Sequence, residues 1–338
     1  MRLHRYFLYT AYVLLGVALI HGIFPLTFSR NYVEIPFHRG EALSVFAHRL
    51  RGASVIRFEK LYLSLVRLFG RDRSIKPGKY RFKTRGNELF AFWETINQKP
   101  EPIEIEVTIP PGLRARDIAR IISNRMGIDT LLIIPLITDT TFINVLAVEF
   151  PRLRGVKSLE GFLMPDTYRF EEGVDARTIL SEMVSNFFRK WNEYALDTLL
   201  VKSPLNFYDV VKLASIVEKE AVKEREKPVI ASVFLNRLRI GMPLQANPTI
   251  WYITGRSAYW LTKTDLKIDS PYNTYIHRGL PPTPICNPSL SSIIAVLKPA
   301  RTRYLYFVAD GKGGHVFSSS YRKHMENVWR LKSLKRAD

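Results

Sequence analysis

Three scarcities in this sequence each exclude a class of protein. The 338 residues contain one cysteine, Cys286, which excludes an internal disulfide and a metal site built from several cysteines. Acidic residues are few: 31 Asp and Glu stand against 50 Lys and Arg, giving a net charge of +19 at pH 7. Low-complexity and repeated segments are missing, and aromatic residues make up 12% of the chain, so long disorder is not expected.

Long apolar runs are also missing, with one exception near the N-terminus. Residues 6–28, YFLYTAYVLLGVALIHGIFPLTF, contain no Asp, Glu, Lys or Arg, and a helix needs about 20 such residues to cross a bilayer. Arg2 and Arg5 precede the run, which places the N-terminus in the cytoplasm. A cleaved signal peptide and a buried globular helix are the alternatives, but the run is long for a signal core and no small-residue cleavage site follows. We expect a single-pass anchor over residues 1–29.

An anchored chain restricts the partners that its positive charge can attract. A basic excess predicts attraction to a polyanion. With the rest of the chain outside the cytoplasm, nucleic acid is not expected, and the membrane surface or an acidic wall polymer is.

The remaining pattern predicts an α+β protein with two domains. Residues 31–106 read as a small mixed domain, with a strand at VEIPF, helices near 43–50 and 59–68, and a strand after Pro77-Gly78. Residues 107–332 form a larger, mainly helical α/β domain. It contains an irregular stretch at 241–290 and ends in a predicted β-hairpin, YLYFVADGKGGHVFS.

One glutamate in LASIVEKEAVKEREK, residues 213–227, is placed unlike the others. On a helix over 206–224 at about 100° per residue, Glu218 shares its inward face with Val211, Ala214 and Val222. Burial raises the pKa of a carboxyl group unless a cation or several donors compensate, and a raised pKa suits a general acid. The alternative is a structural glutamate paired with Arg237 or Arg239. Five further charged residues of the stretch are assigned to the solvated surface: Lys219, Glu220, Lys223, Glu224 and Lys227.

Two motifs in the irregular stretch favour carbohydrate binding. Both NRLRIGMPLQANPTIWY and SPYNTYIHRGLPPTPICNP are rich in amides and aromatic rings, which hydrogen-bond sugar hydroxyl and acetamido groups and cover sugar faces. Asn and Pro also simply build turns, so this interpretation has a plain alternative. The candidate substrate-binding residues are Gln245, Asn247, Tyr272, Asn273 and Tyr275.

Five stretches together resemble one known family. They are EGFLMPDTYRF, LASIVEKEA, VFLNRLRIGMPLQANPT, SPYNTYIHRGLPPTPICNPS and YLYFVADGKGGHVFS. In this order and spacing they resemble the YceG-like, MltG-type endolytic murein transglycosylases, over essentially the whole chain. The resemblance implies that Glu218, the first glutamate of VEKE, is catalytic. It also implies that residues 31–106 form a LysM-like membrane-proximal subdomain and that residues 107–332 form the catalytic domain.

Two positions depart from the family pattern. The family usually has IPEG where this chain has IPPG at 109–112, and DPT where it has Asn247-Pro248-Thr249. We expect the first departure to lie away from the site and to affect a turn. The second argues against an essential acidic role at position 247, although Asn can still hydrogen-bond a sugar.

The reaction implied by the resemblance needs one carboxyl group and no metal or organic cofactor. Protonated Glu218 would donate to the oxygen between N-acetylmuramic acid and N-acetylglucosamine, and the carboxylate would then take the proton of the muramic acid 6-hydroxyl, leaving a 1,6-anhydro end. Such cleavage would terminate glycan elongation. The alternatives are a hydrolytic muramidase, with Glu160 or Asp166 as second carboxylate, and a wall-binding scaffold without activity.

The resemblance also implies partners and a location. The partners are peptidoglycan glycan strands, the bacterial membrane and peptidoglycan synthases. The location is the bacterial cytoplasmic (inner) membrane, with the catalytic domain outside, which is the periplasm in a Gram-negative cell. Glu160 and Asp166, both in EGFLMPDTYRF, are further candidates for substrate binding.

Overall fold

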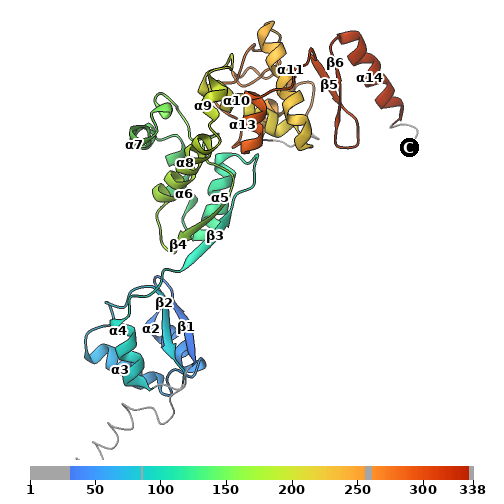
Figure 1. Cartoon of the computed structure of the whole chain (residues 1–338). Coiled ribbons are helices and arrows are strands. Elements are labelled where there is room, and N and C mark those ends of the chain that lie inside the picture. Colours follow the sequence, from blue (N-terminus) through green and yellow to red (C-terminus); the bar gives the residue numbers. More distant parts are fainter. Residues whose placement is uncertain (1–30, 85–86, 256–260, 335–338) are drawn as a thin grey trace, which may run out of the picture. The chain divides into compact units, whose positions relative to one another are not determined.

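The computed structural model describes residues 31–84, 87–255 and 261–334 (Figure 1). These fall into two compact units: one runs to Ile105 and includes 169–173, and the other comprises 106–168 and 174 onward. The anchor expected over 1–29 lies outside the described residues. Within the described ranges no single helix is long and apolar enough to cross a membrane. The pair Thr130–Ile137 and Thr140–Glu149, bent by 66°, passes the same length and composition test together.

The first unit packs helices on a two-stranded sheet. Its strands are antiparallel, with Tyr32 opposite Lys83 and Phe37 opposite Gly78, and its core includes the buried rings of Phe46, Tyr62 and Phe82. The strands and helices predicted here are confirmed, whereas the LysM-like assignment stays a prediction. The elements are β1 (Tyr32–Phe37), α2 (Leu43–Gly52), α3 (Glu59–Leu68), β2 (Gly78–Lys83) and α4 (Glu88–Asn97).

The second unit is mainly helical. Strands β3 (Glu104–Thr108) and β4 (Thr167–Glu171) pair with each other, and each strand has residues in both units. The predicted hairpin is confirmed as β5 (Tyr306–Ala309) and β6 (His315–Ser318). The helices are α5 (Ala115–Met126), α6 (Thr130–Ile133), α7 (Thr140–Glu149), α8 (Ala176–Glu193), α9 (Leu196–Leu200), α10 (Phe207–Glu220), α11 (Lys227–Arg239), α12 (Asn247–Thr254), α13 (Leu290–Leu297) and α14 (Tyr321–Leu334).

Helix α10 is the centre of this unit, because it packs against both α11 and α13 (Figure 1). Asn206 caps its start by accepting the Asp209 N–H at 2.9 Å. The helix predicted over 206–224 is too long, since α10 ends at Glu220 and Ala221 is extended. Val222, expected on the inward face, is therefore 76% exposed. The chain turns here because α11 starts at Lys227, with a proline in its first turn, and packs back on α10.

Candidate active site

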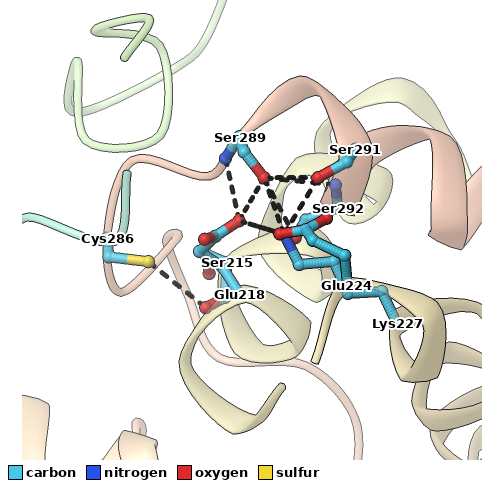
Figure 2. A network of polar contacts seen from close by, with 8 residues as sticks. All are labelled: Ser215, Glu218, Glu224, Lys227, Cys286, Ser289, Ser291 and Ser292. Carbon is cyan, nitrogen blue, oxygen red and sulfur yellow. Dashed lines mark hydrogen bonds and ion pairs between the residues drawn. The ribbon is translucent and has the colours of Figure 1, made fainter. Parts of the chain in front are cut away.

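The Glu218 carboxyl group lies at the end of α10 and is held through one oxygen (Figure 2). Its Oε2 accepts the Ser289 N–H at 2.9 Å, the Ser289 hydroxyl at 2.5 Å and the Ser292 hydroxyl at 2.6 Å. The side chain is 9% exposed. Oε1 takes no hydrogen bond from any residue that the structure describes. One carboxyl oxygen is thus fixed, and the other has no donor among the described residues.

Three of the donors to Glu218 come from the beginning of α13. Ser289 is the N-cap of this helix, and its hydroxyl accepts the Ser292 N–H at 3.4 Å. A helix N-terminus carries a partial positive charge and unpaired N–H groups, so it stabilises a carboxylate placed against it. The motif quoted from the sequence ends at Ser289 and gave it no role, and Ser291 and Ser292 lie beyond that motif. The sequence feature that predicts a helix N-terminus here is Ser289, a preferred N-cap residue, directly after Pro288.

Lys227 is the cation beside Glu218. It is 2% exposed, and its Nζ lies 3.4 Å from Glu218 Oε2, 3.0 Å from Ser289 Oγ and 2.9 Å from Ser291 Oγ. A second carboxylate, Glu224 Oε1, lies 2.5 Å away. The assignment of Lys227 to the solvated surface is wrong, because the first turn of α11 lies over the end of α10 (Figure 2).

The alternative pairing of Glu218 with Arg237 or Arg239 is also wrong. The Arg237 guanidinium donates to the carbonyl of Leu305 at 2.6 Å and to that of Leu244 at 2.7 Å. Arg239 donates to Asn236 Oδ1 at 3.2 Å. Arg237 therefore holds two backbone segments, and Glu218 depends on Lys227 instead.

Glu220 belongs to a separate cluster. The expectation that it is solvated is wrong: it is half-buried, and burial raises its pKa to about 7 against the opposing charge of Arg237. Burial, together with the charge of Glu220, also raises the pKa of Tyr275. The Tyr275 hydroxyl donates to Asn247 Oδ1 at 2.5 Å. The predicted substrate-binding residues Asn247 and Tyr275 thus contact each other, close to the charge of Glu220.

The IPPG motif adjoins the site, so the expectation that it lies away from it is wrong. A Cβ on Gly112 would lie 3.6 Å from Glu218 Cγ, and Lys219 Nζ donates to the Gly112 carbonyl at 3.2 Å. Gly112 has φ +78°, a conformation that favours glycine. The departure at Pro111, where the family usually has an acidic residue, is exposed directly before Gly112.

Asn287 ties its own motif to EGFLMPDTYRF and to Leu113, which directly follows IPPG. Its side chain is fully buried. Oδ1 accepts the N–H groups of Gly161 at 2.9 Å and Leu163 at 3.0 Å, and Nδ2 donates to Glu160 Oε1 at 2.9 Å and the Leu113 carbonyl at 3.1 Å. The sequence interpretation did not single out this residue, because an Asn before a Pro reads as a turn.

Glu160 is 5% exposed, and burial raises its pKa to about 8 although Arg114 acts in the opposite direction. Its Oε1 also accepts the Ala115 N–H at 2.9 Å. It lines a cavity of about 340 Å³ with Arg114 and Tyr252. The Tyr252 ring packs against Tyr272, another predicted residue, with the two ring centroids 4.9 Å apart.

The other predicted residues have structural partners. Asn273 is fully buried and donates to two backbone carbonyls, at 3.0 and 2.8 Å, so its amide is not exposed to a glycan here. Burial acts to raise the pKa of Asp166, but hydrogen bonds from Lys190 and Asn186 outweigh it and lower this pKa. Gln245 is exposed with φ +50°.

Cys286 is buried and donates to the Ser215 carbonyl at 3.3 Å (Figure 2), and burial raises the pKa of its thiol. In the described part of the chain no three His, Cys, Asp or Glu side chains gather in a way that could hold a metal ion.

Comparisons with known proteins agree with the resemblance seen in the motifs. The sequence profile of the YceG-like family matches residues 33–330. The endolytic murein transglycosylase of Bacillus subtilis is 33% identical over 306 residues, covering 88% of this chain and 84% of the relative. That of Streptococcus pneumoniae is 28% identical over 324 residues, but this chain spans only 58% of its length. A crystal structure of a yceG-like protein from Listeria monocytogenes has a TM-score of 0.61 and 29% identity, covering 88% of this chain and 99% of the other.

Proposed function

Because the chain belongs to the YceG-like family, we propose that it is a peptidoglycan lytic transglycosylase in which Glu218 carries the chemistry. The observation that supports this most is the Glu218 carboxyl group itself. It is anchored by one oxygen at a helix N-terminus, while the other oxygen has no partner among the described residues. Motifs of the family come together around it, since Gly112 of IPPG and Ser289 both lie against this side chain.

The proposed reaction uses one carboxyl group twice. Protonated at Oε1, Glu218 donates to the glycosidic oxygen as positive charge develops at the muramic acid anomeric carbon. The carboxylate left behind takes the proton from the 6-hydroxyl of the same sugar, whose oxygen bonds to the anomeric carbon. The products are a free N-acetylglucosamine end and a 1,6-anhydro muramic acid end. Lys227 and the two serines favour the carboxylate that forms after the first proton transfer.

Hydrolysis by a second carboxylate has less support. Glycosidases that use water or an enzyme nucleophile need an ionised second carboxylate at a set separation. Glu160, with a pKa of about 8, is mostly neutral at pH 7. Asp166 is ionised but bound to Lys190 at 2.8 Å. Neither offers a free carboxylate, and this favours the 6-hydroxyl of the substrate as the nucleophile.

The setting of the reaction is part of the proposal. Residues 1–29 would anchor the chain in the bacterial cytoplasmic membrane, with the N-terminus inside and the catalytic unit outside. The unit that starts at residue 31 would then lie next to the membrane as a LysM-like subdomain. From there the enzyme would cleave nascent strands close to the synthases that make them.

The test compares Glu218→Gln with wild type on purified peptidoglycan, with products identified by mass spectrometry. Gln keeps the size of the side chain but has no proton to transfer, so the rate should fall by about 10²–10⁴. Glu193→Gln, an exposed residue on α8, is the matched control and should retain activity. Reducing muramic acid ends from the wild type would establish hydrolysis instead. Unchanged release of anhydro ends by a folded Glu218→Gln variant would refute the role of Glu218.

A further inference from the structure

The cavity that contains Glu160 adjoins the residues that hold Glu218. Gly112 lies against Glu218, and Arg114 follows two residues later on the cavity wall. A chain advances at most about 3.6 Å per residue, so the Cα atoms of Gly112 and Arg114 lie within roughly 7 Å of each other. On the other side, Asn287 donates to Glu160 and Ser289 donates to Glu218. Two short segments therefore connect the cavity to the reacting carboxyl group.

The cavity offers cations and a hydrogen-bond donor. Arg114 is half-buried, with its guanidinium 5.0 Å from the Tyr252 ring centroid and bonded to the Trp251 carbonyl. The Arg116 side chain is 50% exposed, and its Nε lies 3.9 Å from Asp117, a long ion pair that leaves it able to bind another anion. Glu160 uses Oε1 for its described partners, so its proton is available on Oε2.

We propose that this cavity binds a carboxylate of the stem peptide carried by the muramic acid residue that is cleaved. The inference rests on the proposed function, because it assumes a peptidoglycan strand at Glu218. Guanidinium groups pair with carboxylates in a fixed fork geometry, and Ile134 and Ile137 supply apolar wall for the peptide backbone. The stem peptide is attached to the sugar whose anomeric carbon reacts, so its capture here would position that carbon.

A sugar acetamido group is the other occupant that the cavity could take. It is neutral and needs no cation, whereas Arg114 is kept half-buried at a cost in desolvation that a bound anion offsets. Charge therefore separates the two occupants. Coupling the substrate carboxylates to methylamine removes their charge and leaves the acetamido groups unchanged.

The experiment uses the full-length chain in detergent with two substrates: native strands and strands whose carboxylates have been converted to methylamides. Arg116→Gln should lower kcat/KM on native strands about tenfold, mainly by raising KM. The effect is modest because a hydrogen bond to a charged group contributes less free energy when the side chain is half-exposed. When methylamidated strands replace native ones, the kcat/KM of wild type should also fall about tenfold. On the methylamidated strands, Arg116→Gln should have a kcat/KM only slightly below that of wild type. Arg125→Gln, at the exposed far end of α5, is the matched control and should discriminate as wild type does.

Binding to both substrates, measured by co-sedimentation, separates this inference from the enzymatic one. If strands are cleaved but wild type treats both substrates alike, the carboxylate site is refuted and the enzyme assignment stands. An equal loss of Arg116→Gln on both substrates would also refute it, because the cavity would then contact the sugar. Arg116-dependent preference for charged strands without any cleavage would support the site and refute the enzyme assignment.

Discussion

Glu160→Gln should stabilise the protein increasingly as the pH rises. The pKa of Glu160 is about 8 in the folded chain against 4.5 as the ordinary value. The folded chain therefore keeps a proton that the unfolded chain releases. Stability from the neutral carboxyl group is fully present below about pH 4.5 and is lost as the pH rises through about 8. Gln resembles the neutral acid at every pH and keeps the oxygen that accepts from Ala115 and Asn287.

The magnitude follows from the two pKa values. Between them, each pH unit costs about 1.4 kcal/mol of folding free energy. From pH 5 to pH 8 the free energy of unfolding of wild type should therefore fall by about 3 kcal/mol on account of Glu160 alone. Because Glu160 is 5% exposed, solvent screening reduces this figure little. Other groups titrate equally in both proteins, so the difference between variant and wild type isolates this residue.

Urea unfolding of residues 31–338 at several pH values, followed by circular dichroism, measures the difference directly. Glu149→Gln, which removes an exposed carboxylate at the end of α7, controls for the loss of one negative charge. A difference that stays flat from pH 5 to pH 8 would contradict the reasoning. It would mean that Glu160 is ionised in the folded chain, and the hydrogen-bond donor inferred for the cavity would be lost with it.

Three further outcomes are expected. Lys227→Met should lower turnover, and it should lower stability by about 3 kcal/mol because a buried ion pair loses one partner. Arg225→Met, at an exposed residue of the same turn, should change neither the thermal melt nor the turnover rate. Deleting residues 1–29 should leave cleavage of isolated wall material intact, and a need for added lipid would show that the segment does more than tether. Binding of residues 31–338 to anionic liposomes should weaken steeply with salt, because the Debye length falls from about 10 Å at 0.1 M to about 3 Å at 1 M. Cleavage of a short saturating glycan should not follow it.

Periodicity predicted what lies within single elements. The helices and strands of the first unit and the β5–β6 hairpin emerged from local patterns of apolar residues and turns. Glu218 was also found this way, since its neighbours Val211 and Ala214 are fully buried on the same helix. The argument failed where the helix ended: Glu220 and Val222 were placed by extending a period beyond the turn that starts at Ala221.

The partners of Glu218 could not be predicted, because they come from elements distant in sequence. Ser289 and Ser292 are more than 70 positions away along the chain and reach Glu218 only because α13 packs its N-terminus against α10. Lys227 has the sequence environment of a surface lysine, among Glu224, Arg225 and Glu226. Only the packing of α11 on α10 buries it. The family motifs marked these segments as important without saying which atoms meet.

The choice of serines around Glu218 bears on how a single carboxyl group can act first as acid and then as base. A lysine alone donates and never accepts, so it would hold the group in its ionised form. A neutral hydroxyl can donate to Oε2 in both states, because Oε2 is the carbonyl oxygen when the proton is on Oε1, and Ser289 and Ser292 lie 2.5 and 2.6 Å from Oε2. Lys227 is farther, at 3.4 Å, and shares its charge with Glu224. This arrangement stabilises the carboxylate without excluding the acid, and both states are needed within one turnover.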